Sequence, residues 1–281
     1  MIFNQQQSLH KELSRYRALQ KTIGFVPTMG ALHTGHLSLV EKALSQNGIV
    51  VVSIFVNPTQ FNNASDLQKY PRSLDQDVKL LQTLNGVVLI YAPKPSDLYG
   101  KQVISKHYDF GGLENPMEGK FRKGHFDGVG TVLNLLFRAI RPDKAYFGEK
   151  DFQQLQVVRK LVQLEKLPVE IVGCPISREP HGLAMSSRNN RLSDTQFEEA
   201  GLIYQTLKEV QYKFDQYSVT KLKDWVQKQF SKNAHLELEY FEIAIAKTLK
   251  PAVRKRSGNT YRAFIAVFAG EVRLIDNMAL N

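Results

Sequence analysis

The sequence contains a single cysteine, Cys174, so no disulfide can form within the chain. No stretch approaches the run of about 20 apolar residues that spans a bilayer, and residues 1–7 lack the basic region and long apolar stretch of a signal peptide. Hydrophobic residues make up 43% of the chain and charged residues 23%, which argues against a disordered protein. These absences predict a globular protein that acts in the cytoplasm and has no membrane partner.

A concentrated basic segment is also missing, although the formal net charge is +10. Residues 1–176 carry 21 basic and 15 acidic side chains, and residues 177–281 carry 16 and 12, so excesses of +6 and +4 are spread along the chain. The densest basic run, 254–256, lies beside a predicted turn and is typical of a solvated loop. The charge therefore predicts no nucleic-acid partner, but a positive field that attracts anionic small molecules such as ATP.

What is present is a strand, a tight turn and a helix start over residues 23–40. The first four of these residues are apolar and predict a buried strand, Pro27 stops it, and Gly30 lets the backbone turn. His33 and His36 follow at the helix start, where unpaired N–H groups and the positive end of the helix dipole favour an anion. The H-x-G-H spacing indicates a nucleotide-phosphate site; helix-start polar residues or metal ligands are the alternatives.

Apolar strand patterns alternate with helical patterns through the first 176 residues. The run 49–56 is rich in β-branched residues, as in a buried parallel strand, and no G-x-G-x-x-G accompanies it, which argues against a nicotinamide or flavin dinucleotide. We therefore predict an α/β fold, with a Rossmann-like parallel sheet and helices on both faces over residues 1–176. A smaller C-terminal α+β domain is expected over residues 177–281, with two helices followed by three strands.

Polar residues follow the predicted strands, at the edge where open α/β sheets bind ligands. Asn57 and Gln60 come after the strand 49–56. For Asn57 we favour turn chemistry beside Pro58, and for Gln60 a ligand contact.

A second strand, glycine turn and helix start covers residues 144–154. Lys150 would lie over an anion at the helix N-terminus, Asp151 suits a cap, and Gln154 lies one turn further along the same face as Lys150. A surface cap without a ligand is the alternative.

Three loops complete the pattern. Residues 102–109 alternate like an exposed or edge strand whose His107 is a surface residue, and the glycine-rich, basic residues 115–128 suit a lid. In that lid, Arg122 and His125 could contact phosphate or cap the following helix. Residues 177–192 are predicted to be a ligand loop that joins the two domains.

Six blocks of sequence resemble the pantothenate synthetase family, also called pantoate–β-alanine ligase. They are PTMGALHTGH (27–36), FVNPTQF (55–61), YPR (70–72), GHFDGV (124–129), YFGEKDFQQ (146–154) and GLAMSSRN (182–189). The blocks occur in the family's order and cover the whole predicted N-terminal domain and the junction. The sequence departs from the family pattern at two places. His181 stands where an acidic residue is usual. In the loop after Gln60, Asn62 and Ser65 replace a glycine and an acidic residue.

The resemblance implies ligation of pantoate to β-alanine, with ATP cleaved to AMP and pyrophosphate through a bound pantoyl-adenylate. It implies Mg²⁺ with the ATP, for which the sequence assigns no ligand residues, and a homodimer. Catalytic roles fall on His36, Lys150, Arg188 and His33, and pantoate binding on Gln60 and Gln154. The implied ATP contacts are Met29, Gly30, Ala31, Leu32, His33, Thr34, Gly35, His36, Gly148, Glu149, Lys150, Asp151, Ser177, Met185, Ser186, Ser187 and Arg188.

Two other classes of function share parts of this pattern. A cytidylyl- or adenylyltransferase carries H-x-G-H and releases pyrophosphate, but it keeps the nucleotide in its product. A nucleic-acid-binding protein would use the basic charge and need no ATP.

Overall fold

A computed structural model describes residues 1–62 and 64–281. The chain divides into two compact units. The N-terminal unit comprises Met1–Gly111, Phe121–Glu149 and Gln154–Pro175, and the C-terminal unit comprises Gly112–Lys120, Lys150–Gln153 and Ile176–Asn281. Two short segments from the first 176 residues thus group with the C-terminal unit, which a division of the chain at one point does not foresee.

The N-terminal unit alternates strands and helices along the chain. Its strands are β1 (Ile2–Phe3), β2 (Ile23–Thr28), β3 (Ile49–Ile54), β4 (Val88–Tyr91), β5 (Lys144–Gly148) and β6 (Glu170–Cys174). Its helices are α1 (Gln6–Ala18), α2 (Thr34–Leu44), α3 (Ala64–Lys69), α4 (Leu74–Leu81), α5 (Pro95–Tyr99) and α7 (His125–Ile140), with the short turn η1 (Pro58–Gln60). The helix α6 (Glu118–Phe121), the turn η2 (Glu149–Asp151) and the helix α8 (Phe152–Leu164) each contain residues of both units.

The six strands form one parallel sheet in the order β1-β4-β3-β2-β5-β6. The predicted parallel α/β sheet is confirmed. From β2 the chain builds outward through β3 and β4 on one side, and it then returns to add β5 and β6 on the other. The carboxyl ends of β2 and β5 therefore flank the point where the strand order reverses, which is where open α/β sheets bind ligands.

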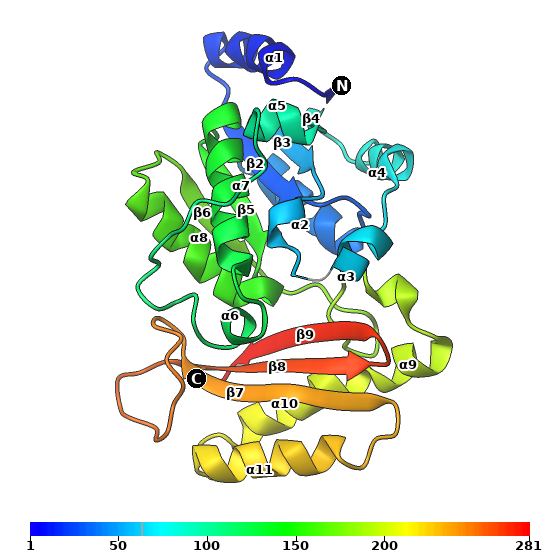
Figure 1. Ribbon diagram of the computed structural model, residues 1–281, viewed down its shortest axis with the longest axis vertical. Helices are drawn as coiled ribbons and strands as arrows, with labels where there is room; N and C mark the ends of the chain where they lie inside the picture. The colour runs from blue at the N-terminus through cyan, green and yellow to red at the C-terminus, as the bar shows by residue number, and fades with distance from the viewer. Residues whose placement is uncertain (63) are drawn as a thin grey trace. The chain divides into compact units, whose positions relative to one another are not determined.

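Helices cover both faces of this sheet (Figure 1). Because successive side chains of a strand point to opposite faces, Val26 and its neighbours on one face pack against α2 and α4. Phe25 points to the other face, where its ring lies 6.0 Å from that of Phe137 on α7. Cys174 is buried at the end of β6 and belongs to the same core cluster as Val26.

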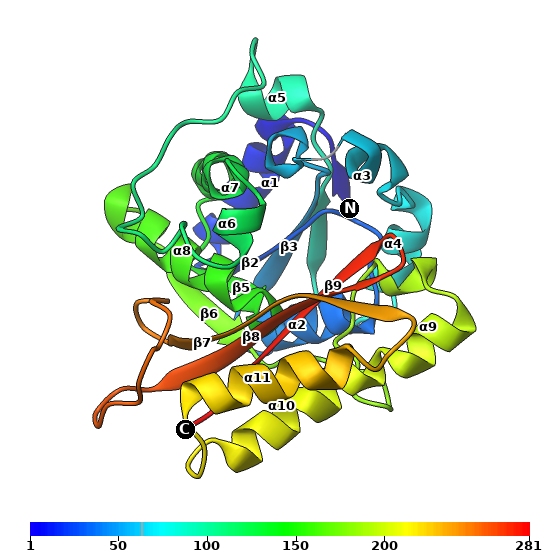
Figure 2. The same ribbon diagram turned by 60° about the horizontal axis from the view of Figure 1, so that its bottom comes forward.

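The C-terminal unit is an antiparallel sheet packed on helices (Figure 2). Its strands β7 (Leu236–Ile245), β8 (Tyr261–Ala269) and β9 (Val272–Ala279) pair in chain order. The helices are α9 (Asp194–Glu199), α10 (Gly201–Lys213) and α11 (Val219–Phe230), so three helices stand where the sequence predicted two. Alternate residues of β8, such as Ala263 and Ile265, form one buried cluster with α10 and α11.

One further expectation needs correction, and one short strand was not foreseen. Residues 102–109 are irregular and form no strand, because their N–H groups find other partners: that of Lys106 donates to the side chain of Thr131, and that of Tyr108 to Asp127. The short strand β1, which the sequence analysis missed, pairs with β4. Within the described ranges, no helix combines the length and hydropathy needed to cross a membrane.

Candidate active site

The turn after β2 has an unusual backbone. Gly30 has φ of 83° and Ala31 has φ of 50°, so two consecutive residues adopt the left-handed region. Such a conformation points neighbouring N–H groups into one concavity that suits an anion. The anion present is part of the protein: the Asp77 carboxylate accepts hydrogen bonds from the N–H groups of Ala31 at 3.0 Å and Leu32 at 2.7 Å.

Asp77 comes from the first turn of α4 and is 2% exposed. Burial raises the pKa of its carboxyl, against the opposing effect of the two backbone donors and Ser73. Asp77 has no local signal in the sequence, because it lies 45 positions away from the Leu32 N–H that it accepts. Two N–H groups of the predicted nucleotide segment are thus used to fix the turn itself.

The two histidines lie at the start of α2, as predicted, with His33 as the N-cap residue. Their rings are 4.0 Å apart and tilted by 45°. The backbone N–H of His33 donates to Nδ1 of His36 at 3.3 Å. Because Nδ1 accepts this bond, the proton of a neutral His36 ring is assigned to Nε2.

Gln60 lies beside the turn that carries the histidines. Its amide Nε2 donates to the Met29 sulfur at 2.8 Å, and its Oε1 accepts from Asn57 Nδ2 at 3.1 Å. The loops after β2 and β3 therefore meet at the carboxyl edge of the sheet. The two bonds also fix which end of the Gln60 amide faces which neighbour.

Asn57 does more than the turn chemistry that the sequence favoured. It is 1% exposed, and its Oδ1 accepts from the hydroxyls of Tyr99 at 2.5 Å and Thr59 at 3.1 Å. With Oδ1 occupied in this way, Nδ2 must face Gln60 and the carbonyl of Gly128. Burial raises the pKa of the Tyr99 hydroxyl, which keeps this donor protonated. The signal for Asn57 was its place directly after a buried strand.

Arg122 and His125, from the glycine-rich loop, both contact the backbone of the Gln60 loop. Nδ1 of His125 donates to the Gln60 carbonyl oxygen at 2.9 Å, and Nη2 of Arg122 donates to the same oxygen at 3.4 Å. His125 is 5% exposed. Both side chains thus hold the backbone of the Gln60 loop, His125 from the first residue of α7 and Arg122 from the residues just before this helix.

The second predicted corner follows β5. Gly148 and Glu149 belong to the N-terminal unit, as does Gln154, whereas Lys150 and Asp151 belong to the C-terminal unit. The Lys150 ammonium lies 3.8 Å from the Asp151 carboxylate. Gly148 ends the strand next to β2, so this corner and the histidine turn follow adjacent strands.

The loop 177–192 begins as a tight hairpin in the C-terminal unit. The N–H of Met185 donates to the Ser177 carbonyl at 3.0 Å, and Arg178 and Ala184 form an antiparallel bridge. This pairing brings together Ser177 and the block 185–188, which the sequence analysis placed on one ligand. Gly182 closes the hairpin with φ of 103°.

The block at the end of this hairpin is compact. Ser186 Oγ accepts the N–H of Arg188 at 3.2 Å, and Ser187 is 7% exposed. The Asn189 side chain donates to the Ala184 carbonyl at 3.2 Å. Local hydrogen bonds therefore shape the turn that presents Arg188.

The side chains of His181 and Asn62, which depart from the family pattern, donate hydrogen bonds to backbone carbonyls. The His181 ring packs 4.7 Å from Phe197, and its Nε2 donates to the Phe197 carbonyl at 3.0 Å. The Asn62 side chain donates to the Lys123 carbonyl, which ties the loop after Gln60 to the glycine-rich loop. Ser65 lies exposed in α3.

The described residues include no group of three or more His, Cys, Asp or Glu side chains that could hold a metal ion.

The open parallel sheet, with polar loops after β2, β3 and β5, defines a Rossmann-like α/β protein that carries its candidate site at the carboxyl edge. A sequence model described as pantoate-beta-alanine ligase matches residues 1–279. The chain belongs to this family.

Two relatives are similar in sequence to this chain over its full length. The pantothenate synthetase of Christiangramia forsetii is 53% identical over 280 residues, which cover 100% of this chain and 99% of that protein. The pantothenate synthetase of Flavobacterium psychrophilum is 52% identical over 281 residues and covers all of both chains.

Solved structures are similar as well. The pantothenate synthetase of Thermus thermophilus superposes with a TM-score of 0.91 at 40% identity over 99% of each chain. The pantoate-beta-alanine ligase of Francisella tularensis, solved in complex with beta-gamma ATP and beta-alanine, gives a TM-score of 0.80 at 37% identity, covering 100% of this chain and 97% of that one.

Proposed function

We propose that this chain joins pantoate to β-alanine at the expense of ATP, using the residues described above. The observation that carries the proposal is the family match over residues 1–279. Pantoate and ATP give a bound pantoyl-adenylate and pyrophosphate. The amine of β-alanine then displaces AMP from the acyl group and forms the amide of pantothenate.

The nucleotide is assigned to both units of the chain. The N-terminal unit supplies Met29 to His36 together with Gly148 and Glu149, and the C-terminal unit supplies Lys150, Asp151, Ser177 and the block 185–188. Support comes from the H-x-G-H turn at the start of α2 and from the hairpin that pairs Ser177 with Met185. Our proposal is that the residues of each set contact ATP.

The first step needs charge stabilisation more than a base. The pantoate carboxylate is already ionised, so the barrier lies in bringing two anions together at a crowded phosphorus. His36 Nε2–H, Lys150 and Arg188 supply donors and positive charge, while His33 caps the helix that carries His36. Donors that are held in place before the reaction stabilise the transition state without reorganisation.

Pantoate is assigned to Gln60 and Gln154. An uncharged amide can donate to the pantoate carboxylate or accept from its hydroxyls without a salt bridge that would weaken the nucleophile. The bonds from Asn57 and to Met29 support this role for Gln60, because they give its amide one orientation.

The remaining assignments follow the family resemblance. We propose that Mg²⁺ enters with the phosphates of ATP, that the chain forms a homodimer, and that it works in the cytoplasm. The test for the metal is removal with EDTA, which should abolish turnover until Mg²⁺ is restored; unchanged turnover would contradict it. Light scattering checks the dimer.

A single assay tests the reaction. The chain is incubated with ATP, pantoate and β-alanine, and AMP is measured with each acid omitted in turn. AMP that requires both acids supports ligation. A stable product that retains the nucleotide would indicate a nucleotidyltransferase, and salt-sensitive RNA binding without turnover would indicate a nucleic-acid-binding protein.

A further inference from the structure

The four-residue segment Lys150–Gln153, here called the Lys150 turn, runs from η2 into the first turn of α8, and it belongs to the C-terminal unit. One reason is Asn277 on β9. Its Nδ2 donates to the Lys150 carbonyl oxygen at 2.8 Å, and the side chain is almost fully buried at 2% exposure. The backbone of the predicted ATP lysine is therefore held by the last strand of the chain.

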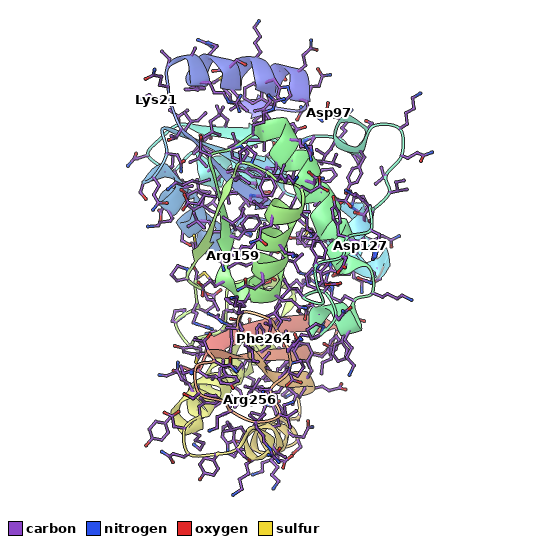
Figure 3. The ribbon with its side chains drawn as sticks, turned by 90° about the vertical axis from the view of Figure 1, so that its left-hand side faces the viewer. Lys21, Asp97, Asp127, Arg159, Arg256 and Phe264 are labelled. Carbon is purple, nitrogen blue, oxygen red and sulfur yellow. The ribbon has the colours of Figure 1, made fainter. Side chains whose placement is uncertain are left out.

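The rest of the turn is held as well. The Arg262 guanidinium lies 3.9 Å from the centre of the Phe152 ring and donates to Oδ1 of Asn277. Phe152 also lies 6.1 Å from Phe264, which is labelled on β8 in Figure 3. The stacked guanidinium and the two rings leave the turn little freedom to shift along the sheet.

The segment Gly112–Lys120 supports the turn from its other end. Gln153 Nε2 donates to the carbonyls of Leu113 and Pro116, and its Oε1 accepts the N–H of Glu118 at 3.0 Å. Glu118 in turn forms a two-bond ion pair with Arg273 on β9, at 2.8 Å for each bond. Burial would lower the pKa of Arg273, but the bonds to Glu118 and Glu239 outweigh it and raise the pKa.

The neighbouring residue Asp276 holds the other predicted ATP segment of this unit. Arg178, the residue after Ser177, donates through Nη1 and Nη2 to the two Asp276 oxygens at 2.6 and 3.1 Å. The Asp276 side chain is 1% exposed, and Arg178 Nη1 also donates to the Gly182 carbonyl. A paired ion buried this deeply fixes the hairpin that leads to Arg188.

Asp276 and Asn277 are adjacent, and consecutive residues of a strand point to opposite faces. Asp276 shares its face with Leu274 and the helical core, whereas Asn277 shares its face with Phe264 and Arg273. One dipeptide of β9 thus fastens the Lys150 turn to one face of the sheet and the Arg188 hairpin to the other.

We propose that Asp276 and Asn277 are positioning residues that hold Lys150 and Arg188 at a fixed spacing within the C-terminal unit. The inference rests on the proposed binding of ATP by these two residues. Two cationic groups fixed to one strand meet the phosphates in a preset geometry, and misplacement by about 1 Å can lower a rate a hundredfold.

The test is pantoate-dependent ATP–pyrophosphate exchange, which isolates adenylate formation. Asn277→Ala should lower kcat by on the order of tenfold or more, with KM for pantoate unchanged. Asn277→Asp has the same shape and can still accept from Arg262, but it cannot donate to the Lys150 carbonyl, so it should show the same loss. This variant keeps the test decisive if Asn277→Ala does not fold.

Asn281→Ala is the matched control. Asn281 also donates through Nδ2 to a backbone carbonyl, that of Asn259 at 3.0 Å, just beyond the end of β9. Within the described part of the chain it bonds to neither the Lys150 turn nor the hairpin, so this variant should exchange at the normal rate. Equal losses in Asn281→Ala and Asn277→Ala would overturn the inference.

Double variants separate positioning from general destabilisation. In a Lys150→Ala background, Asn277→Ala should add less than about a twofold loss, because the group that it positions is already gone. Asp276→Asn should likewise add little in an Arg188→Ala background. Independent, multiplicative losses would overturn the inference.

The single variants separate this inference from the proposed function. A normal exchange rate in Lys150→Ala would refute the proposed role of Lys150 and the inference with it. A reduced rate in Lys150→Ala together with a normal rate in Asn277→Ala would overturn the inference alone.

Discussion

The Asp77 carboxylate accepts the Leu32 N–H at 2.7 Å, across 45 positions of sequence, and holds the turn that carries both histidines. Replacing Asp77 by alanine leaves the N–H groups of Leu32 and Ala31 without this buried acceptor. Each unsatisfied buried donor costs about 1–3 kcal/mol, so we expect Asp77→Ala to lower the free energy of unfolding by about 2–6 kcal/mol. Urea denaturation measures this change.

The variant Asp77→Asn and a control separate charge from packing. An asparagine has one acceptor oxygen, so it should restore part of the lost stability. Asp75→Ala serves as the control, because Asp75 is an exposed aspartate of the same first turn of α4. A loss in Asp75→Ala equal to that in Asp77→Ala would show that the turn does not depend on the buried carboxylate.

His36 illustrates how the structure refines a residue that the sequence already identified. Its Nδ1 accepts the His33 N–H, so the ring should offer Nε2–H to the developing charge. We expect His36→Ala to reduce pyrophosphate exchange about a hundredfold, the usual effect of removing one such donor, while the circular dichroism spectrum stays unchanged. His36→Gln, whose amide can donate at a similar reach, should recover part of the rate.

The exposed residue His107 provides the control for His36. Its side chain is 85% exposed and pairs with Asp127. His107→Ala should therefore exchange normally, and a normal rate in His36→Ala would remove this histidine from the proposed chemistry.

The sequence predicted those parts of the fold and site that depend on local order. Continuous apolar runs foretold the strands of the parallel sheet, and the spacing of His33 and His36 marked the start of α2. Asp77 and Asn277 were missed because each acts on a backbone group far away in the chain. No periodicity or motif records such a partner; only the folded chain brings it into contact.

The irregular segment 102–109 shows the opposite error, because here the sequence predicted a strand that the structure does not contain. Its alternating residues satisfied the pattern of a strand, but a strand also needs a neighbour with free N–H and C=O groups. The side chains of Thr131 and Asp127 on α7 take two of its N–H groups instead. A binary pattern cannot distinguish a ladder of backbone bonds from a set of side-chain bonds.

The amide of Gln60 is oriented by a chain of hydrogen bonds from Tyr99 through Asn57. We expect Gln60→Ala to raise KM for pantoate much more than KM for ATP, because the amide is assigned to the acid. Tyr99→Phe removes the hydroxyl that holds Asn57 and should raise KM for pantoate by a smaller factor, on the order of threefold to tenfold, the equivalent of about 1 kcal/mol.

Steady-state kinetics with each substrate varied in turn measures both effects. Tyr91→Phe is the matched control for Tyr99→Phe, because the Tyr91 hydroxyl donates to Asp97 and not to Asn57. Its KM for pantoate should stay normal. If Gln60→Ala changed the two KM values equally, the amide would not be specific for pantoate.

Gly128 of α7 offers a test of how closely the Gln60 loop must approach the helix. A Cβ at this position would lie 2.4 Å from the Thr59 carbonyl oxygen and 2.8 Å from the Gln60 nitrogen, so Gly128→Ala must push the loop away. The same loop carries the Asn57 side chain that bonds to the Gly128 carbonyl. We therefore expect this variant to raise KM for pantoate by at least about tenfold, since displacement of a binding group by about 1 Å weakens its contacts severely.

Gly130→Ala distinguishes this effect from simple loss of stability. Gly130 is on the same helix, but its Cβ would meet the rings of Phe110 at 3.0 Å and Tyr108 at 3.1 Å, away from the Gln60 loop. Both variants crowd α7 and should lower the melting temperature, yet only Gly128→Ala should change KM for pantoate. A similar rise in Gly130→Ala would mean that pantoate binding responds to the packing of α7 as a whole, and the specific link between Gly128 and Gln60 would be lost.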